Sequence, residues 1–114
     1  MQSDLTIRHH VEANQFEIPL GDDLAVLGYK MRNGVMVMTH TEVPPAMQGK
    51  GIAGQLAQAA LNYAQAEGLS VIAQCTFVAS YVRRHPEFQA FTTIPEGLQY
   101  KRIEAEGNLK RGTT

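Results

Sequence analysis

The stretch from Val43 to Gly54, VPPAMQGKGIAG, decides how the rest of the chain is interpreted. It follows residues 35–41 (VMVMTHT), an almost continuously apolar run that is typical of a central strand covered on both faces. It precedes residues 52–67, where apolar side chains recur at spacings of three and four, the pattern of an amphipathic helix. Pro44 and Pro45 cannot donate to a sheet ladder, so they end the strand. The stretch is therefore predicted to be a glycine-rich loop between a buried strand and a long helix.

Two further strands are predicted on the N-terminal side of this unit. Residues 14–20 (NQFEIPL) and 23–31 (DLAVLGYKM) have the composition of strands joined by a turn at Gly21–Asp22. Asn33-Gly34 is typical of a hairpin turn, because both residues tolerate the positive φ that such a turn requires. These strands and the one before the loop should form an antiparallel meander.

On the C-terminal side, residues 70–76 (SVIAQCT) predict a short strand, and residues 78–84 predict a helical turn that ends before Pro86. The strands at 35–41 and 70–76 flank a helix, so their connection is a crossover and they should be parallel, with the helix packed across them. The predicted fold is an α/β (α+β) mixed sheet. An N-terminal antiparallel meander is followed by a parallel β–α–β crossover with helices packed on the sheet.

The length of the chain fits one domain. Compact domains mostly run to ~100–150 residues, and this chain has 114 residues with a mass of 12.5 kDa. We expect a single domain over residues 1–95. Residues 96–114 lack a convincing apolar period, so they are interpreted as a partly disordered C-terminal extension, with a short helix over residues 98–106 as the alternative.

Composition and charge exclude several classes of function. Ten basic and eleven acidic residues give a net charge of −1, so no overall basic field would attract nucleic acid or an anionic membrane. The single cysteine excludes an internal disulfide framework and a CxxC zinc site. No apolar run approaches the ~20 residues of a membrane-spanning helix, and the polar N-terminus does not resemble a secretory signal. We expect a cytoplasmic protein that is a monomer or a weak dimer.

The glycine loop has the properties of an anion-binding turn. Glycines allow the backbone to approach a ligand closely, and the free N–H groups at a helix start favour phosphate. Gly49, Gly51 and Gly54 spell the dinucleotide motif GxGxxG, but the preceding strand ends several residues early and the next strand ends without an acidic residue. A Walker A motif is excluded because Lys50 is followed by Gly51 instead of Ser or Thr.

A third motif fits its position in the chain. The hexapeptide Gln48-Gly49-Lys50-Gly51-Ile52-Ala53 reads Q-x-x-G-x-A and resembles the acyl-CoA pyrophosphate loop of the GCN5-related N-acetyltransferases (GNAT). The segments HTEVP (40–44), CTFV (75–78) and YVRRHPEF (81–88) are similar to the small GNAT-like branch known as the YjdJ-type N-acetyltransferase domain. The resemblance covers roughly residues 14–91.

This resemblance implies an acetyl-CoA-dependent acyltransferase. In GNAT domains acetyl-CoA lies where two parallel strands splay apart, and backbone amides at the end of the first strand hold the pantetheine arm. The matching segment here runs from Thr41 to Val43. The loop amides that would hold the pyrophosphate belong to Gln48, Gly49, Lys50, Gly51, Ile52 and Ala53. The chain omits much of the N-terminal substrate-binding portion of full-length GNATs, so the resemblance leaves the amine acceptor open, whether a small molecule or a protein lysine.

Three reactive side chains should lie at the same end of the sheet. His40 and Glu42 come at the end of one parallel strand, and Cys75 comes at the matching end of its neighbour. Strand alternation directs His40 and Glu42 to one face and Thr41 to the other, whereas the face of Cys75 depends on the register. Arg83, Arg84 and His85 form a local basic cluster positioned to meet CoA phosphates, and a solvated helix end is the alternative interpretation.

Two mechanisms follow from these residues. In direct transfer, Glu42 or His40 deprotonates a primary amine, and Cys75 or Tyr81 protonates the departing CoA thiolate. In the covalent route, Cys75 accepts the acetyl group first, which requires activation because a thiol of pKa ~8.5 is only about 3% thiolate at pH 7. We favour direct transfer. The alternatives are a non-catalytic CoA-binding module that acts as a sensor or interaction protein, or a purely structural domain.

The remaining histidines are not assigned a role, and no metal site is predicted. His9 and His10 are placed in an irregular terminus without a partner. A metal site would need His40, His85 and an acidic residue to converge, and no spacing indicates this. We therefore expect no metal.

Overall fold

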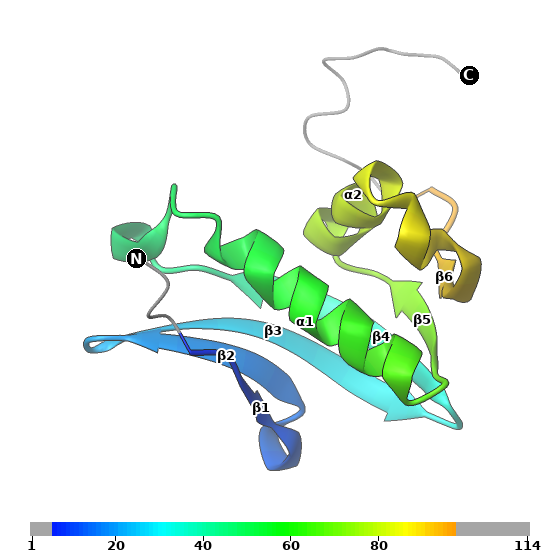
Figure 1. The fold of residues 1–114 in the computed structure, drawn as a ribbon, viewed down its shortest axis with the longest axis horizontal. Helices are drawn as coiled ribbons and strands as arrows, with labels where there is room; N and C mark the ends of the chain where they lie inside the picture. The colour runs from blue at the N-terminus through cyan, green and yellow to red at the C-terminus, as the bar shows by residue number, and fades with distance from the viewer. Residues whose placement is uncertain (1–5, 98–114) are drawn as a thin grey trace.

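The computed structural model describes residues 6–97 as a six-stranded sheet with two α-helices (Figure 1). The strands are β1 (Arg8–His10), β2 (Gln15–Leu20), β3 (Asp23–Arg32), β4 (Val35–Glu42), β5 (Ser70–Ala73) and β6 (Thr92–Thr93). The helices are α1 (Ile52–Ala66) and α2 (Thr76–Arg84), with 3₁₀ turns η1 (Val11–Ala13), η2 (Pro45–Met47) and η3 (Pro86–Phe91). The predicted extension lies largely outside the described residues. No helix within residues 6–97 is long and apolar enough to span a membrane.

The strands lie side by side in chain order, β1-β2-β3-β4-β5-β6. The first four pair antiparallel, and β4-β5-β6 pair parallel. This confirms the predicted α+β fold, an antiparallel meander followed by a parallel crossover. The hairpin between β3 and β4 turns at Asn33 and Gly34, whose φ angles of 48° and 83° lie in the left-handed region.

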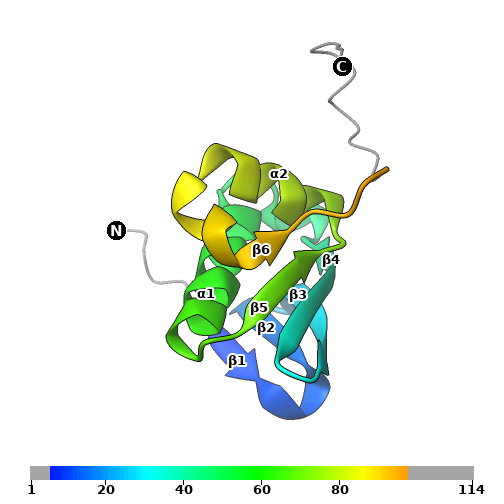
Figure 2. The same ribbon diagram turned by 90° about the vertical axis from the view of Figure 1, so that its right-hand side faces the viewer.

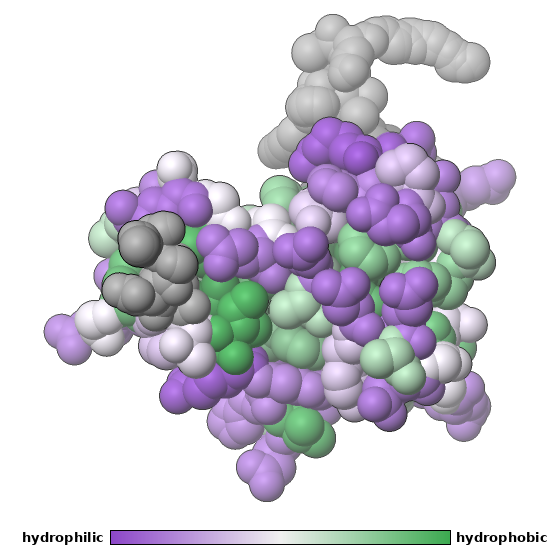
Figure 3. Space-filling view, viewed as in Figure 1, coloured by the Kyte–Doolittle hydropathy of each residue, from purple (hydrophilic) through white to green (hydrophobic). Residues whose placement is uncertain are grey.

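Both helices lie on one face of the sheet, and α1 runs diagonally across it (Figures 1 and 2). This follows from the right-handed rule, because β4-α1-β5 and β5-α2-β6 cross over in the same direction. The core between them is apolar and includes Phe16, Leu27, Met36, Met38 and Leu56. Polar groups dominate the outer surface on this side, with a small apolar patch beside the N-terminal half of α1 (Figure 3).

The parallel pairing is shorter than the sequence predicts. β5 ends at Ala73, not at residue 76, because the chain turns at Gln74 and Cys75 to begin α2. The N–H groups of Gln74 and Cys75 both donate to the Met38 carbonyl, each at 3.0 Å. β4 continues beyond this point to Glu42 and is paired there with β3. The two parallel strands therefore part after Met38.

A β-bulge interrupts β4 just past this fork. Gly28 of β3 is opposite His40, and Tyr29 is opposite Met38, so Thr39 is an extra residue in β4. The bulge changes the alternation of the strand. Met36 and Met38 face the helices, and past the bulge it is Thr41 that faces them, opposite the core residue Leu27.

Two strands were not predicted. β1 pairs with β2, with His9 opposite Phe16, and β6 is a two-residue strand parallel to β5. Neither has a detectable sequence pattern, since each is shorter than the four to eight residues over which alternation can be recognised. The prediction that His9 and His10 lie in an irregular terminus without a partner is therefore wrong.

Candidate functional site

The loop after β4 is anchored to the core at its start. The N–H of Met47 donates to the Pro44 carbonyl at 2.8 Å, closing the turn η2, and the Met47 side chain is fully buried. The Gln48 side chain turns back, and its Nε2 donates to the Val43 carbonyl at 3.0 Å. Gln48 thus braces the loop against the end of β4.

Past Gln48 the backbone needs glycine. Gly49 and Gly51 have φ angles of 80° and 74°, in the left-handed region that residues with a Cβ rarely adopt. Gly51 precedes α1, and its carbonyl accepts the first helical hydrogen bond, from the Gln55 N–H at 3.1 Å. The N–H groups of residues 52–54 therefore come before the first helical bond, at the positive end of the helix dipole.

A hollow of about 320 Å³ lies between this loop and α2. Its lining combines the loop, the first turn of α1 and the side of α2 that faces them. The lining residues are Val43, Met47, Gln48, Gly49, Gly51, Ile52, Ala53, Gly54, Phe77, Tyr81 and Arg84. Backbone donors thus line one wall and aromatic rings the other, an arrangement suited to an anionic ligand that also has an apolar part.

Most of the residues predicted to hold a cofactor line this hollow, and some do not. Val43, Gln48, Gly49, Gly51, Ile52 and Ala53 line it. The Gln48 N–H, predicted to bind the pyrophosphate, donates instead to the Pro45 carbonyl at 3.2 Å. Lys50 is exposed at the tip of the loop, and Thr41 lies deeper in β4. Of the basic cluster Arg83-Arg84-His85, Arg84 lines the hollow, and its Nη1 donates to Ser80 Oγ at 2.8 Å.

Tyr81 lines the α2 wall of the hollow and is held between other rings. The His85 ring stacks on it with centroids 3.9 Å apart, and Phe77 lies one turn earlier at 6.3 Å. The His85 Nδ1 hydrogen-bonds with the Tyr81 carbonyl at 2.7 Å, which fixes the stack. Burial, with a smaller effect of Glu87, raises the pKa of Tyr81, so the phenol keeps its proton at neutral pH. Tyr81 therefore lines the hollow in its protonated form.

The other candidates lie near the fork between β4 and β5, on two different faces of the sheet. Cys75 Sγ lies 3.4 Å from Thr41 Oγ1 on the helix side. His40 and Glu42 lie on the opposite face, because their partners Gly28 and Val26 face away from the core. His40, Glu42 and Cys75 thus lie at the same end of the sheet, but Cys75 is on the opposite face from His40 and Glu42.

The His40 ring covers Gly28 on the open face of the sheet. A Cβ at Gly28 would collide with this ring, so the glycine leaves the space that the ring fills. His40 Nδ1 also lies 3.1 Å from Thr39 Oγ1, in the bulge. The ring thereby lies over β3 and is exposed to solvent.

Three residues of the hollow were not predicted as site residues. Phe77, Tyr81 and Arg84 are spaced by four and three residues, so they share one face of α2. The predicted helical turn began at residue 78 and therefore did not include Phe77. Met47 has no sequence signature, since a buried methionine is usually core. Gly54 belongs to the GxGxxG spacing, which was set aside together with the dinucleotide interpretation.

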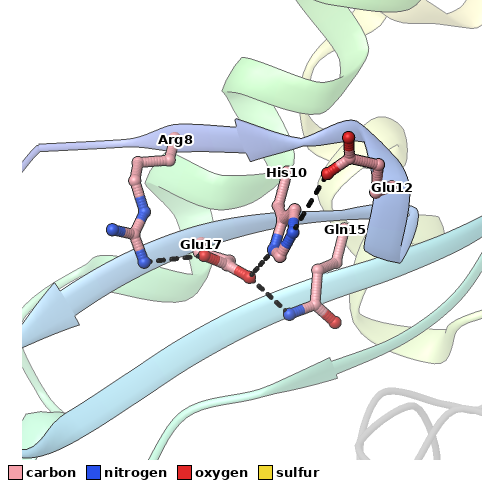
Figure 4. Close-up of polar contacts among 5 residues, drawn as sticks. All are labelled: Arg8, His10, Glu12, Gln15 and Glu17. Atoms are coloured by element: carbon pink, nitrogen blue, oxygen red, sulfur yellow. Dashed lines mark hydrogen bonds and ion pairs between the residues drawn. The ribbon is translucent and has the colours of Figure 1, made fainter.

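A polar cluster lies on β1 and β2 (Figure 4), and none of its residues is among those that line the hollow. Glu17 is buried and accepts hydrogen bonds from Gln15 Nε2 at 2.6 Å and Arg8 Nη2 at 2.8 Å, and its Oε2 lies 3.0 Å from His10 Nδ1. The hydrogen bond from Gln15 is the largest cause that lowers the pKa of Glu17, to about 2, with His10 and Arg8 adding to it. The cluster fastens β1 to β2.

His9 fastens the other side of β1. Its ring stacks on Phe16 with centroids 4.1 Å apart, and its Nε2 hydrogen-bonds with Tyr29 Oη at 2.6 Å. Burial lowers the pKa of His9. Within residues 6–97, no three His, Cys, Asp or Glu side chains converge where they could hold a metal ion.

The sequence profile of the GCN5-related N-acetyltransferase family matches residues 15–91. This range covers most of the chain and contains both walls of the hollow. The chain therefore belongs to the GCN5-related N-acetyltransferase family.

Relatives with curated names agree with this assignment. The chain is 35% identical to Protein NATD1 of Mus musculus over 85 residues, which are 72% of this chain and 77% of that protein. It is 36% identical to Protein NATD1 of Xenopus tropicalis over 87 residues, 74% of this chain and 80% of that protein. The NMR structure of a GCN5-like protein from Staphylococcus aureus superposes with a TM-score of 0.65 at 25% identity, covering 84% of this chain and 95% of the other.

Proposed function

We propose that this chain binds acetyl-CoA in the hollow between the glycine loop and α2 and transfers the acetyl group to a primary amine. The observation that carries the proposal is the coincidence of two features at one place. The loop and the first turn of α1 offer backbone donors beside the hollow, and β4 and β5 part next to it. Membership of the N-acetyltransferase family supports the same activity.

The loop end of the hollow suits the diphosphate of CoA. The N–H groups of Gly49, Gly51 and the first turn of α1 would bind the diphosphate oxygens, aided by the helix dipole. The charges of Lys50 and Arg84 would add to this attraction. The pantetheine arm would then run past Val43 toward the fork, where β4 beyond Met38 has no pairing to β5.

We propose direct transfer, with the two faces of the sheet carrying different steps. The amine would approach from the open face, where His40 or Glu42 accepts its proton, directly or through water. The amine nitrogen forms a bond to the acetyl carbon, and the carbon–sulfur bond breaks. Tyr81, which keeps its proton at neutral pH, would protonate the departing thiolate from the helix side.

The covalent route through Cys75 has weaker support. The polar side-chain contact of Cys75 Sγ within the described residues is Thr41 Oγ1 at 3.4 Å, and a threonine hydroxyl is not a base at neutral pH. His40, the base that would activate the thiol, faces the other side of the sheet. If Cys75→Ala keeps full activity, the covalent route is excluded.

A titration followed by a turnover assay tests the proposal. Thermal unfolding with acetyl-CoA, CoA and NADH should show stabilisation by the first two only, because binding to the folded state raises Tm. Free CoA thiol should then appear faster when a primary amine is added. Stabilisation by NADH alone would contradict the proposal. Stabilisation by CoA without amine-dependent thiol release would instead establish a binding module without catalysis.

A further inference from the structure

The Thr39 side chain connects the Gly28 carbonyl with the His40 ring. Its Oγ1 donates to the Gly28 carbonyl at 3.3 Å, and the same oxygen lies 3.1 Å from His40 Nδ1. A hydroxyl has one hydrogen to donate and two lone pairs that can accept. Because a carbonyl can only accept, the hydrogen of Thr39 is used in the bond to Gly28. Toward His40, the Thr39 hydroxyl therefore acts as an acceptor.

This order of donors determines which nitrogen of His40 has the hydrogen. In a neutral imidazole, one nitrogen is a donor and the other an acceptor. Nδ1 must be the donor to Thr39 Oγ1, so the lone pair is at Nε2. Within residues 6–97, Nε2 has no hydrogen-bond partner, and the side chain is exposed. The neutral ring thus presents an acceptor nitrogen on the open face of the sheet.

Gly28 and the bulge keep the His40 ring in place. A Cβ on Gly28 would collide with His40 Cε1 and would lie 3.0 Å from both ring nitrogens, so the ring occupies the space of a side chain. Gly28 has no positive φ, so this contact is what favours glycine here. Thr39 is the extra residue of β4, and the bulge lets its hydroxyl meet the ring of the next residue. In a regular strand, neighbouring side chains point to opposite faces.

Glu42, the other candidate base, is not held in this way. It lies on the same face of the sheet as His40 and is exposed. Among the residues that the structure describes, its side chain has no hydrogen bond or ion pair. A catalytic group that is fixed before the substrate arrives keeps the productive geometry at a lower entropic cost. The fold therefore prepares His40, and not Glu42, to accept a proton.

We infer that Thr39 is a positioning residue that fixes His40 as the Nδ1–H tautomer and thereby makes Nε2 the base for the amine. The inference rests on the proposed function and chooses between the two bases that it leaves open. Because the ring lies over β3, a water molecule would pass the proton from the amine to Nε2. In net terms, one nitrogen–hydrogen bond of the amine breaks and the Nε2–H bond forms. The resulting imidazolium still donates through Nδ1 to Thr39, and the exposed ring then releases the proton to solvent.

Nitrogen NMR tests the tautomer without any substrate. At alkaline pH, where histidines are neutral, the protonated and unprotonated ring nitrogens of ¹⁵N-labelled protein have well-separated chemical shifts. We expect His40 to show a protonated Nδ1 and an unprotonated Nε2, both in wild type and in Thr39→Ser, which keeps the hydroxyl. Thr39→Val removes the hydroxyl at nearly constant shape, so it should show a mixture of the two tautomers. An Nε2–H tautomer in wild type would overturn the inference.

Turnover, with spermidine and a lysine peptide as amines, tests whether the tautomer matters. Thr39→Val should lower kcat about tenfold, because the base remains but is less well positioned, whereas a base itself contributes roughly 10²–10⁴-fold. KM for acetyl-CoA should stay unchanged, since Thr39 does not line the hollow. Thr39→Ser should recover most of the lost kcat. Thr92→Val is the matched control, because Thr92 Oγ1 also donates to a carbonyl, that of Phe88 at 2.7 Å, and lies outside the hollow.

The other outcomes separate this inference from the proposed function. If wild type acetylates either amine and Thr39→Val keeps the wild-type kcat, Thr39 is not a positioning residue and the proposed function stands. Equal losses of kcat in Thr39→Val and Thr92→Val would also refute the inference, since the effect would be a general one. A much larger loss in Glu42→Gln than in His40→Gln would make Glu42 the base and refute it again. If wild type releases no CoA thiol with either amine, the proposed function fails, and the catalytic role of Thr39 fails with it.

Discussion

At the scale of single residues, Tyr81 is the proposed proton donor. Its ring is held by the His85 stack, and burial keeps its phenol protonated. Rings that are fixed on both sides lose little entropy when a ligand binds beside them, which favours a reproducible position of the hydroxyl. The chemistry of the site should therefore be sensitive to the loss of one oxygen atom.

We predict that Tyr81→Phe lowers kcat for amine acetylation by about 100-fold, the usual contribution of a general acid, with little change in KM for acetyl-CoA. The phenylalanine keeps the ring and its packing but cannot donate a proton. Steady-state thiol release checks this. Tyr63→Phe is the control, because Tyr63 lies on α1 outside the hollow. An unchanged kcat in Tyr81→Phe would show that Tyr81 does not protonate the CoA thiolate.

At the scale of elements, the glycine loop and strand β1 are held in place by different kinds of interaction. The loop is fixed by backbone geometry at Gly49 and Gly51, whereas β1 is fixed by side chains that reach across from β2 and β3. Substitutions in the loop should therefore act on ligand binding. Substitutions around β1 should act on stability, and on its dependence on pH.

Gly51→Ala tests the loop. A side chain in the left-handed region costs about 1–2 kcal/mol, so both Gly51→Ala and Gly68→Ala should lower the free energy of unfolding by about that amount. Gly68 ends α1 with φ 70° and lies outside the hollow. Denaturant unfolding should show similar losses, whereas only Gly51→Ala should lose CoA affinity. Equal affinities in the two variants would count against the loop as the binding element.

Glu17 should make stability depend on pH. The pKa of this carboxyl is near 4.5 when unfolded and about 2 when folded, so the folded state favours the ionised form. The resulting stability is present above pH 4.5 and is lost as pH falls toward 2. Glu17→Gln should lower the free energy of unfolding at pH 7 by about 1–3 kcal/mol, the cost of broken buried hydrogen bonds. It should also flatten the acid limb of a Tm–pH curve. Glu12→Gln, at an exposed carboxyl, should leave that curve unchanged, and a wild-type acid limb in Glu17→Gln would disprove the role of Glu17.

Sequence reasoning succeeded where a pattern extends over many residues. Three predicted features are present in the structure. They are the strand from the apolar run at 35–41, the helix from the apolar period of residues 52–67, and the hairpin turn at Asn33-Gly34. β1 was missed because three residues carry no period, and its attachment depends on His9 meeting Phe16 of the next strand and Tyr29 of β3. The same limit applies to Cys75, whose face depended on where β5 ends. Whether the predicted residues act as proposed stays a prediction.

At the scale of the whole molecule, the sheet separates two environments. One face is covered by α1 and α2 (Figures 1 and 2). This face also contains the hollow, and the other face carries the exposed His40 and Glu42. The described core is formed entirely by side chains between Phe16 and Ile94. The elements that build both faces therefore lie within residues 6–97.

A chain truncated after Gly97 should accordingly keep the fold. Because the described side chains already form one core between the sheet and both helices, we expect the Tm to lie within about 2 °C of that of the full chain. CoA affinity should also be retained. Differential scanning calorimetry with and without CoA measures both quantities. A large fall in Tm would mean that residues 98–114 contribute to the folded unit.

The extra residue at Thr39 has a consequence for how this strand can change over time. Without Thr39 the ladder would be regular, with Met38, His40, Thr41 and Glu42 opposite the same partners as now, so a one-codon deletion there would leave each side chain on its present face. If Thr39 were instead drawn into the ladder, the imidazole and carboxylate would turn into the helix layer and the hydroxyl of Thr41 would emerge on the bare side. The strand can therefore lose this one residue, but not the bulge alone, without exchanging the chemistry of its two faces.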